Sequence, residues 1–177
     1  MVCPPGHVAD LLGVRPMARR LRPVGLDFVE TAPLRLVFTA DAAARPEAVY
    51  RALAEEVTQW PTWYRAVTLA RPVDGARGRE VRLVGGVRFV ETIMAADAPE
   101  RYAYRVDEVN APGVRALVEE WRLAPIGSGD GAGTRVRWTF AVDAASPVRG
   151  ALRLARPGFG RAFRDAVRAL DRRLTTV

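Results

Sequence analysis

The chain has 177 residues, a formal net charge of +7, one cysteine and one histidine. This length suits a single domain that buries a core and leaves room for an internal cavity. The lone Cys3 excludes an intrachain disulfide and a thiolate metal cluster, and no apolar run approaches the roughly 18 residues that cross a bilayer.

Residues 1–33 contain several prolines and show no sustained period, which predicts an extended or partly ordered N-terminal extension. Asp10 and two early prolines interrupt the apolar core that a signal peptide needs, so we expect a cytoplasmic location. Met17, which is followed by Ala-Arg-Arg, is an alternative start of the natural chain. We expect the single domain to span residues 34–177.

A strand followed by two short helices opens this domain. Leu34, Leu36 and Phe38 alternate with other residues, which predicts a strand to about residue 41. Pro46 suits the first turn of the next helix, and Pro61 ends that helix and favours a second short helix or turn. Turn signals such as Gly85-Gly86 then separate six further strands, at 67–72, 78–84, 87–95, 101–109, 114–123 and 134–142.

A long C-terminal helix is expected from residue 147 to residue 174. Its apolar residues recur at steps of three and four, and this stripe comprises Phe159, Phe163, Val167, Leu170 and Leu174. Pro157 and Gly158 interrupt the pattern and predict a break or kink between a first arm at 149–156 and a main arm at 159–173. Together these elements make an α+β domain, in which a seven-stranded antiparallel sheet curls around the helix.

The positive charge is concentrated on this last helix. All 27 basic residues are arginine, a bias typical of a GC-rich genome, so a single arginine carries little functional information. Residues 34–144 balance 15 arginines with 15 acidic residues, whereas residues 145–177 carry 8 arginines against two acids. An arginine row is able to neutralise nucleic-acid phosphates or an anionic membrane surface. Since the helix also packs inside the fold, we expect its arginine-rich face to be solvated. Transient contact with a membrane surface is an alternative. We expect no nucleic-acid partner.

Several short motifs follow one another in a recognisable order. They are Arg45-Pro46-Glu47-Ala48-Val49-Tyr50, Trp60-Pro61-Thr62-Trp63, Glu91 with the stretch from Asp97 to Val106, and Glu120-Trp121-Arg122-Leu123-Ala124-Pro125. With the order of elements, they resemble the polyketide cyclase/dehydrase branch of the START-like superfamily, which is also called SRPBCC or birch-pollen-allergen-like. The likeness covers residues 34–174.

This resemblance implies a helix-grip fold, in which the sheet wraps the C-terminal helix and encloses an apolar cavity. Members of the family bind or transport lipids, sterols, polyketides, hormones or quinones, and some catalyse cyclisation, aromatisation or dehydration. The resemblance therefore predicts a fold more strongly than it predicts a reaction.

Strand alternation indicates which side chains point into this interior. Trp138 and Phe140 share a face of the last strand. Leu117 and Trp121 share a face with Glu119, and Phe89 shares one with Glu91. The residues that we expect to contact a ligand are Phe89, Tyr102, Leu117, Trp121, Trp138, Phe140, Trp63, Phe163 and Val167.

After residue 33 the chain has no histidine, cysteine or lysine, which excludes histidine triads, thiol nucleophiles, Schiff bases and histidine metal sites. We expect no metal and no cofactor. Glu91 and Glu119 fall on otherwise apolar faces, where the pKa of a carboxyl rises and suits a general acid or base. Tyr104 would then orient a ligand oxygen or help to hold an enolate.

Structural alternatives stand beside these catalytic assignments. In one alternative, Glu91 and Glu119 pair with arginines at the cavity rim. In the other, a twist or bulge of the strand turns the carboxylate to solvent. Tyr102 and Tyr104 are then cross-strand packing residues.

Three hypotheses for the function follow. The first is a protein that binds an apolar small molecule, of polyketide or lipid type, in the internal cavity. The second is a cyclase, aromatase or dehydratase in which Glu91 or Glu119 is the acid or base. The third is an interaction protein whose interior is filled by its own aromatic side chains.

Overall fold

The computed structural model of the protein describes residues 18–127 and 133–176. Cys3, His7 and Met17 lie outside the described residues, as does most of the glycine-rich loop that follows Gly127. The expectations that concern Cys3 and Met17 therefore stay predictions.

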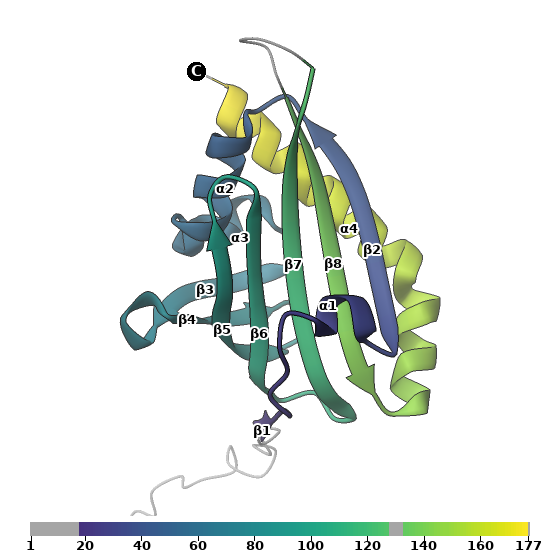
Figure 1. The fold of residues 1–177 in the computed structure, drawn as a ribbon. Helices are drawn as coiled ribbons and strands as arrows, with labels where there is room; N and C mark the ends of the chain where they lie inside the picture. The colour runs from purple at the N-terminus through teal and green to yellow at the C-terminus, as the bar shows by residue number, and fades with distance from the viewer. Residues whose placement is uncertain (1–17, 128–132, 177) are drawn as a thin grey trace, which may run out of the picture.

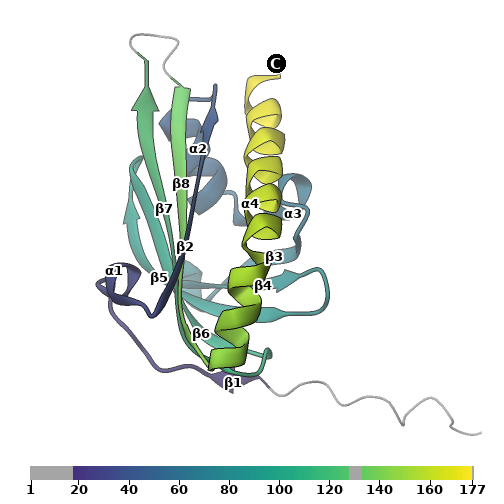
Figure 2. The same ribbon diagram turned by 90° about the vertical axis from the view of Figure 1, so that its right-hand side faces the viewer.

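An antiparallel sheet curves around one side of a long helix, as Figures 1 and 2 show. Its strands are β1 Arg19–Arg20, β2 Leu34–Ala42, β3 Val67–Val73, β4 Gly78–Leu83, β5 Arg88–Asp97, β6 Arg101–Val109, β7 Val114–Ile126 and β8 Gly133–Ala144. The spatial order is β2-β8-β7-β6-β5-β4-β3, and β1 pairs with β6 beside this path. The predicted α+β helix-grip architecture is confirmed, and the two-residue strand β1 is an addition to the seven predicted strands.

Short helices connect the first strands. They are α2 Pro46–Ala54, the 3-10 turn η1 Val57–Gln59, α3 Trp60–Trp63 and the 3-10 turn η2 Asp74–Ala76. Pro46 and Pro61 lie in the first turns of α2 and α3, where a missing N–H leaves no helical hydrogen bond unmade. Beside α4, α2 packs against β6 and β7 and α3 packs against β3 (Figure 1), whereas η2 lies at the turn between β3 and β4.

The C-terminal helix α4 spans Ser146–Thr175 and packs mainly on β2, with further contacts to α3, α2 and β8. Phe163, Val167 and Leu170 are buried in this contact. Gly160 allows the helix to approach closely, because a Cβ atom there would lie 3.2 Å from the ring of Phe38. The helix is not broken at Pro157. It stays continuous and its axis changes direction near the middle (Figure 1), which is the bend that a proline inside a helix causes.

The described part of the N-terminal segment lies on the outer face of the sheet, away from α4 (Figure 2). It contains the short helix α1, Phe28–Thr31, whose Phe28 and Val29 are buried. These side chains form a small second core with Ala116, Val118 and Ala141. The segment therefore covers apolar strand residues that would otherwise face water.

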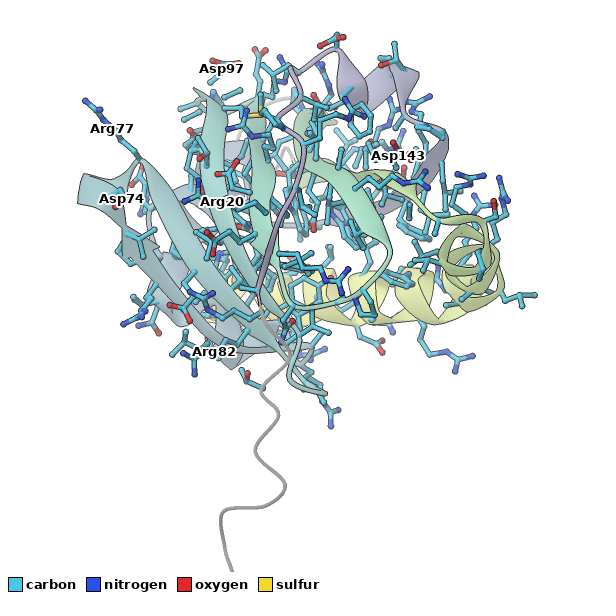
Figure 3. The ribbon with its side chains drawn as sticks, turned by 90° about the horizontal axis from the view of Figure 1, so that it is seen from below. Arg20, Asp74, Arg77, Arg82, Asp97 and Asp143 are labelled. Carbon is cyan, nitrogen blue, oxygen red and sulfur yellow. The ribbon has the colours of Figure 1, made fainter. Side chains whose placement is uncertain are left out.

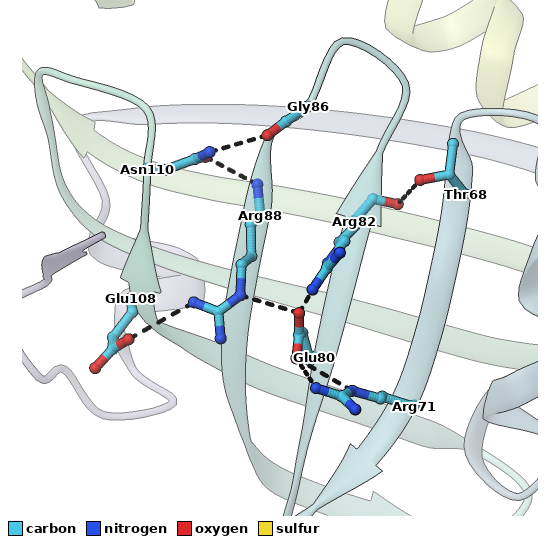
Figure 4. A network of polar contacts seen from close by, with 8 residues as sticks. All are labelled: Thr68, Arg71, Glu80, Arg82, Gly86, Arg88, Glu108 and Asn110. Atoms are coloured by element: carbon cyan, nitrogen blue, oxygen red, sulfur yellow. Dashed lines mark hydrogen bonds and ion pairs between the residues drawn. The ribbon is translucent and has the colours of Figure 1, made fainter. Parts of the chain in front are cut away.

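The rest of the outer face is charged. Arg71, Arg82 and Arg88 all contact the carboxylate of Glu80, at 2.6, 2.9 and 3.0 Å (Figure 4). Burial opposes ionisation of Glu80, but the three arginines outweigh it and lower its pKa to about 2. Figure 3 places Asp74 and Arg77 at the edge of the sheet, at the turn between β3 and β4.

Candidate ligand-binding cavity

A cavity of about 450 Å³ lies between the first half of α4 and the inner faces of β4 to β8. Most of its wall is apolar and includes Phe89, Leu117, Trp138, Phe140 and Phe159. It reaches the surface at its exposed lining residues, which are Val84, Pro112, Gly158 and Ala162. This entrance lies between α4 and the loops that follow β4 and β6.

The position of the cavity follows from the distribution of large and small side chains. Towards the C-terminal half of α4 the interior is filled by stacked rings, with Trp138 at 5.7 Å from Trp121 and 5.9 Å from Phe163 between centroids. Towards the entrance, α4 presents Gly158 and Ala162, which are too small to fill the space. The small residues therefore leave the cavity open to one side.

A buried ion pair forms part of the wall. Arg79 on β4 and Glu91 on β5 are direct cross-strand neighbours, and Nε of Arg79 donates to a carboxylate oxygen of Glu91. Their side chains are each 1% exposed. The guanidinium lies against two rings, 3.8 Å from the centroid of Tyr104 and 4.1 Å from that of Trp60. Its Nη1 and Nη2 atoms are buried and find no hydrogen-bond partner among the described residues.

Glu119 is the second buried carboxyl of the wall. It accepts hydrogen bonds from the hydroxyl of Tyr104 at 2.8 Å and from the indole N–H of Trp138 at 2.9 Å. Burial and the negative charge of Glu91 raise the pKa of Glu119 to about 7, although Tyr104, Arg79 and Trp138 oppose this rise. Glu119 therefore changes its protonation state near neutral pH.

Burial also shifts the pKa values of the other titratable groups nearby. Burial raises the pKa of Glu91, and the adjacent Arg79 opposes this rise. Burial also raises the pKa of Tyr104 well above its ordinary value, and the Glu119 charge adds to the rise. The Tyr104 hydroxyl accepts a hydrogen bond from the indole N–H of Trp121 at 3.0 Å, so Tyr104 is a fixed donor towards Glu119.

A smaller cavity of about 310 Å³ lies on another side of Arg79. Its lining includes the hydroxyl-bearing residues Tyr50, Thr58 and Tyr102. Arg79 thus belongs to the walls of two cavities, one mainly apolar and one richer in hydroxyl groups.

The structure brings together seven of the side chains selected from the sequence. Glu91, Glu119, Tyr104, Phe89, Leu117, Trp138 and Phe140 all line the larger cavity. Glu91 does pair with an arginine, but in the buried interior and not at the rim.

Five expected ligand contacts lie elsewhere. Tyr102 lines the smaller cavity. The other four, Trp63, Trp121, Phe163 and Val167, are buried but line neither cavity. Alternation along a strand or helix identifies the inward face of the element, but it does not give the depth at which neighbouring rings fill the space.

Arg79 is a wall residue that sequence reasoning missed. It alternates with Val81 and Leu83 on β4, and this spacing was the available signal that it shares their inward face. The arginine-rich composition obscured the signal. Trp60 and Tyr64 also line the larger cavity.

No helix within residues 18–127 and 133–176 is long and apolar enough to cross a membrane. No three histidine, cysteine, aspartate or glutamate residues gather there in a way that could hold a metal ion.

A curved antiparallel sheet that grips a long C-terminal helix around an internal cavity defines a helix-grip protein. The chain belongs to the family described as polyketide cyclase / dehydrase and lipid transport, whose model matches residues 33–175. This match confirms the family that the sequence motifs indicated.

Other proteins share its sequence in part, and solved structures share its fold. Uncharacterised proteins of Mycobacterium tuberculosis and Mycobacterium bovis are 33% identical over 154 residues, which is 84% of this chain and 89% of theirs. A START superfamily protein from Mycobacterium smegmatis has a TM-score of 0.62 at 13% identity, over 79% of this chain and 96% of that chain. The di-domain ARO/CYC BexL from the BE-7585A biosynthetic pathway has a TM-score of 0.61 at 19% identity, over 78% of this chain and 45% of that chain.

Proposed function

We propose that the protein binds an apolar small molecule, of polyketide or lipid type, in the larger cavity. The observation that carries this proposal is the cavity itself, which has a volume of about 450 Å³, a mainly apolar wall and a few convergent polar groups. This combination is typical of small-molecule sites in proteins. The family description, which names both polyketide chemistry and lipid transport, supports the same class of ligand.

The third hypothesis required an interior filled by its own aromatic side chains. The stacked rings around Trp138 fill only one part of the interior, and the cavity beside them disfavours a purely structural role.

A blocked entrance tests ligand binding. Ala162 is exposed and lines the cavity, so Ala162→Trp should fill the entrance without disturbing the buried core. Arg161→Trp is the matched control, because Arg161 is exposed on the same helix and does not line either cavity. The probe is N-phenyl-1-naphthylamine, a neutral apolar dye whose fluorescence rises on burial.

We expect the dye to bind the wild type and the Arg161→Trp variant with similar affinity, and Ala162→Trp to bind about tenfold or more weakly, since the indole excludes the dye from the entrance. Equal affinity in all three proteins would place the dye outside the cavity and contradict the proposal. Native mass spectrometry of freshly purified protein, followed by denaturing extraction, would identify any molecule that the cavity retains.

A second candidate function is acid–base catalysis of the cyclase or dehydratase type. The observation that favours it is Glu119, whose pKa of about 7 lets it act in both protonation states near neutral pH. The protonated carboxyl would give its proton to a leaving hydroxyl group, and the carboxylate would remove a proton from carbon. Tyr104, fixed by Trp121, would orient the carboxyl.

The test of this second function separates binding from turnover. A molecule that copurifies with the protein serves as substrate, and Glu119→Gln and Glu91→Gln are compared with the wild type; circular dichroism checks the fold of Glu91→Gln, which leaves buried Arg79 without its partner. The catalytic hypothesis expects normal Kd values and loss of turnover. If the wild type converts no candidate molecule, the binding function stands alone.

Contact with an anionic membrane surface is a further proposal, which concerns how the protein would load and release its ligand. Val84, at the entrance, is 66% exposed, and Leu154 on α4 is 85% exposed. Exposed arginines on α4, among them Arg153 and Arg161, would add attraction to anionic lipid headgroups. Cosedimentation with vesicles of phosphatidylglycerol, compared with phosphatidylcholine, tests this contact.

A further inference from the structure

The polar groups of the larger cavity are gathered on neighbouring strands. Arg79, Glu91, Tyr104 and Glu119 come from β4, β5, β6 and β7 in turn, and these four strands are adjacent in the sheet. The entrance, by contrast, is lined by Val84, Pro112 and small residues of α4. A molecule with one polar end therefore fits the cavity in one orientation, with its apolar body towards the entrance.

Arg79 offers the hydrogen-bond donors that such a polar end needs. Its Nε atom is used by Glu91, and rings of Tyr104 and Trp60 lie against the guanidinium. Nη1 and Nη2 remain as donors in the plane of the group, and both are buried without a partner of hydrogen-bond geometry among the described residues, although the Tyr102 hydroxyl also interacts with the guanidinium. Buried donors without an acceptor are costly, and a planar pair of oxygen atoms satisfies a guanidinium in two places at once.

The charges around Glu119 restrict the ligand further. Glu119 faces Arg79 from β4, Glu91 from β5, Tyr104 from β6, the indole N–H of Trp138 from β8, and Tyr64 after α3. The lining residues of α4 are Val148, Leu152, Gly158, Phe159 and Ala162, none of which carries a charge. Arg79 and Glu91 balance each other, so an ionised ligand beside an ionised Glu119 would leave two uncompensated negative charges in a desolvated space.

We propose that the ligand is amphipathic, that an acidic oxygen head group such as a carboxylate accepts hydrogen bonds from Nη1 and Nη2 of Arg79, and that this head group enters together with one proton held by Glu119. The inference rests on the proposed binding of an apolar molecule and adds the chemical class of its head group. The ligand arrives as an anion, and Glu119 takes one proton from solution. The complex therefore has the same net charge as the free site in which Glu119 is ionised.

Two probes of equal chain length test whether the ligand takes up a proton when it binds. Decanoate has an acidic head group, and decan-1-ol has a neutral one. Isothermal titration calorimetry at pH 8, in two buffers of different ionisation enthalpy, gives the number of protons taken up on binding. We expect decanoate to bind the wild type with uptake approaching one proton, and decan-1-ol to bind with none. Above neutral pH, the Kd of decanoate should rise about tenfold per pH unit, because each binding event consumes a proton.

Glu119→Gln removes the proton acceptor and keeps the shape of the side chain. This variant should bind decanoate without proton uptake and with a Kd that no longer depends on pH. Glu120→Gln is the matched control, because Glu120 is the next buried residue on β7 and faces the other way, towards Arg101 and Arg122. It should retain the proton uptake of the wild type.

A second variant tests Arg79. Loss of Arg79 alone leaves a buried Glu91 without its partner and risks unfolding, so both are neutralised in Arg79→Met with Glu91→Gln. The preference for decanoate over decan-1-ol should fall by about 10- to 100-fold in this double variant, as expected for the loss of a charge-assisted hydrogen bond. Circular dichroism checks its fold.

The outcomes separate the two proposals. Binding of decanoate without proton uptake, or unchanged uptake in Glu119→Gln, overturns the inference. An unchanged preference in the double variant also overturns it, and would mean that Arg79 is satisfied by water of the smaller cavity. In each of these cases the apolar-ligand function stands. If neither probe binds, with chains of 8, 10 or 12 carbons, the apolar-ligand function fails and the inference fails with it.

Discussion

Tyr104 and Glu119 are direct cross-strand neighbours on β6 and β7, and the phenol donates a hydrogen bond to the carboxylate at 2.8 Å. Two tryptophans complete the arrangement, since Trp121 donates to Tyr104 and Trp138 donates to Glu119. The Tyr104 hydroxyl, the Glu119 carboxylate and both indole N–H groups thus find hydrogen-bond partners inside an aromatic cluster. Such a network lets an ionisable group remain in a buried wall.

The first prediction concerns the stability of the protein as a function of pH. The pKa of Glu119 is raised from 4.5 to about 7, so the folded state holds a proton that the unfolded state has already released. The free energy of unfolding should therefore fall as the pH rises from about 4.5 to about 7, by up to about 3 kcal/mol from this group. Urea unfolding of the wild type and Glu119→Gln at pH 5, 6, 7 and 8 measures this contribution.

The difference between the two proteins is the informative quantity, because Glu91 also has a raised pKa and is present in both. We expect Glu119→Gln to gain stability relative to the wild type as the pH rises. Parallel curves for the two proteins would show that Glu119 is ionised in the folded state throughout this range.

The second prediction removes one donor from the network. Tyr104→Phe deprives Glu119 of one hydrogen bond and leaves the indole N–H of Trp121 without its acceptor. We expect a loss of about 1–3 kcal/mol in the free energy of unfolding. Since the Tyr104 hydrogen bond favours the ionised form, the pKa of Glu119 should rise further in this variant. Carbon-13 NMR titration of the glutamate carboxyls follows that pKa. A lower pKa of Glu119 in Tyr104→Phe would contradict the hydrogen bond from Tyr104 to the Glu119 carboxylate.

The third prediction concerns the N-terminal segment. Phe28 is 7% exposed and packs on Ala116, Val118 and Ala141 across the outer face of the sheet. Phe28→Ala should lower the free energy of unfolding by about 3 kcal/mol, because it removes most of the apolar contact of α1. The milder Phe28→Leu serves as control and should cost about 1 kcal/mol. Thermal unfolding measures both, and an unaffected Tm for Phe28→Ala would mean that α1 contributes nothing to the stability of the sheet.

The fourth prediction tests the carboxylate that gathers three arginines. In Glu80→Gln the charges of Arg71, Arg82 and Arg88 lose their common partner, which should cost about 2 kcal/mol at pH 7 and low salt. Because the pKa of Glu80 is lowered to about 2, its contribution is present above about pH 4.5 and disappears as the pH falls through about 2.

The difference between wild type and Glu80→Gln should therefore shrink when urea unfolding is repeated at pH 3 and pH 2. It should also shrink at high salt, since two of the arginines are more than half exposed and are open to screening. A difference that is constant with pH would assign the effect to packing and not to charge.

The sequence alone determined the order of the elements and the inward faces of most strands. Alternation placed Phe89 and Glu91 on one face of β5, and Leu117 and Glu119 on one face of β7, and all four line the cavity. The apolar stripe of α4 was also clear, and Phe163 is fully buried. These features are predictable from the sequence because the periods of helices and strands are local properties of the chain.

Only the tertiary structure decided which residues meet. The pairing of Arg79 with Glu91 depends on the register of β4 and β5, and no local pattern fixes a register across a hairpin whose neighbours contain bulges. Trp121 and Trp138 face each other across β7 and β8, yet only Trp138 lines the cavity. Periodicity selects a face, but the depth of a side chain depends on how neighbouring rings and the bend of α4 divide the enclosed volume.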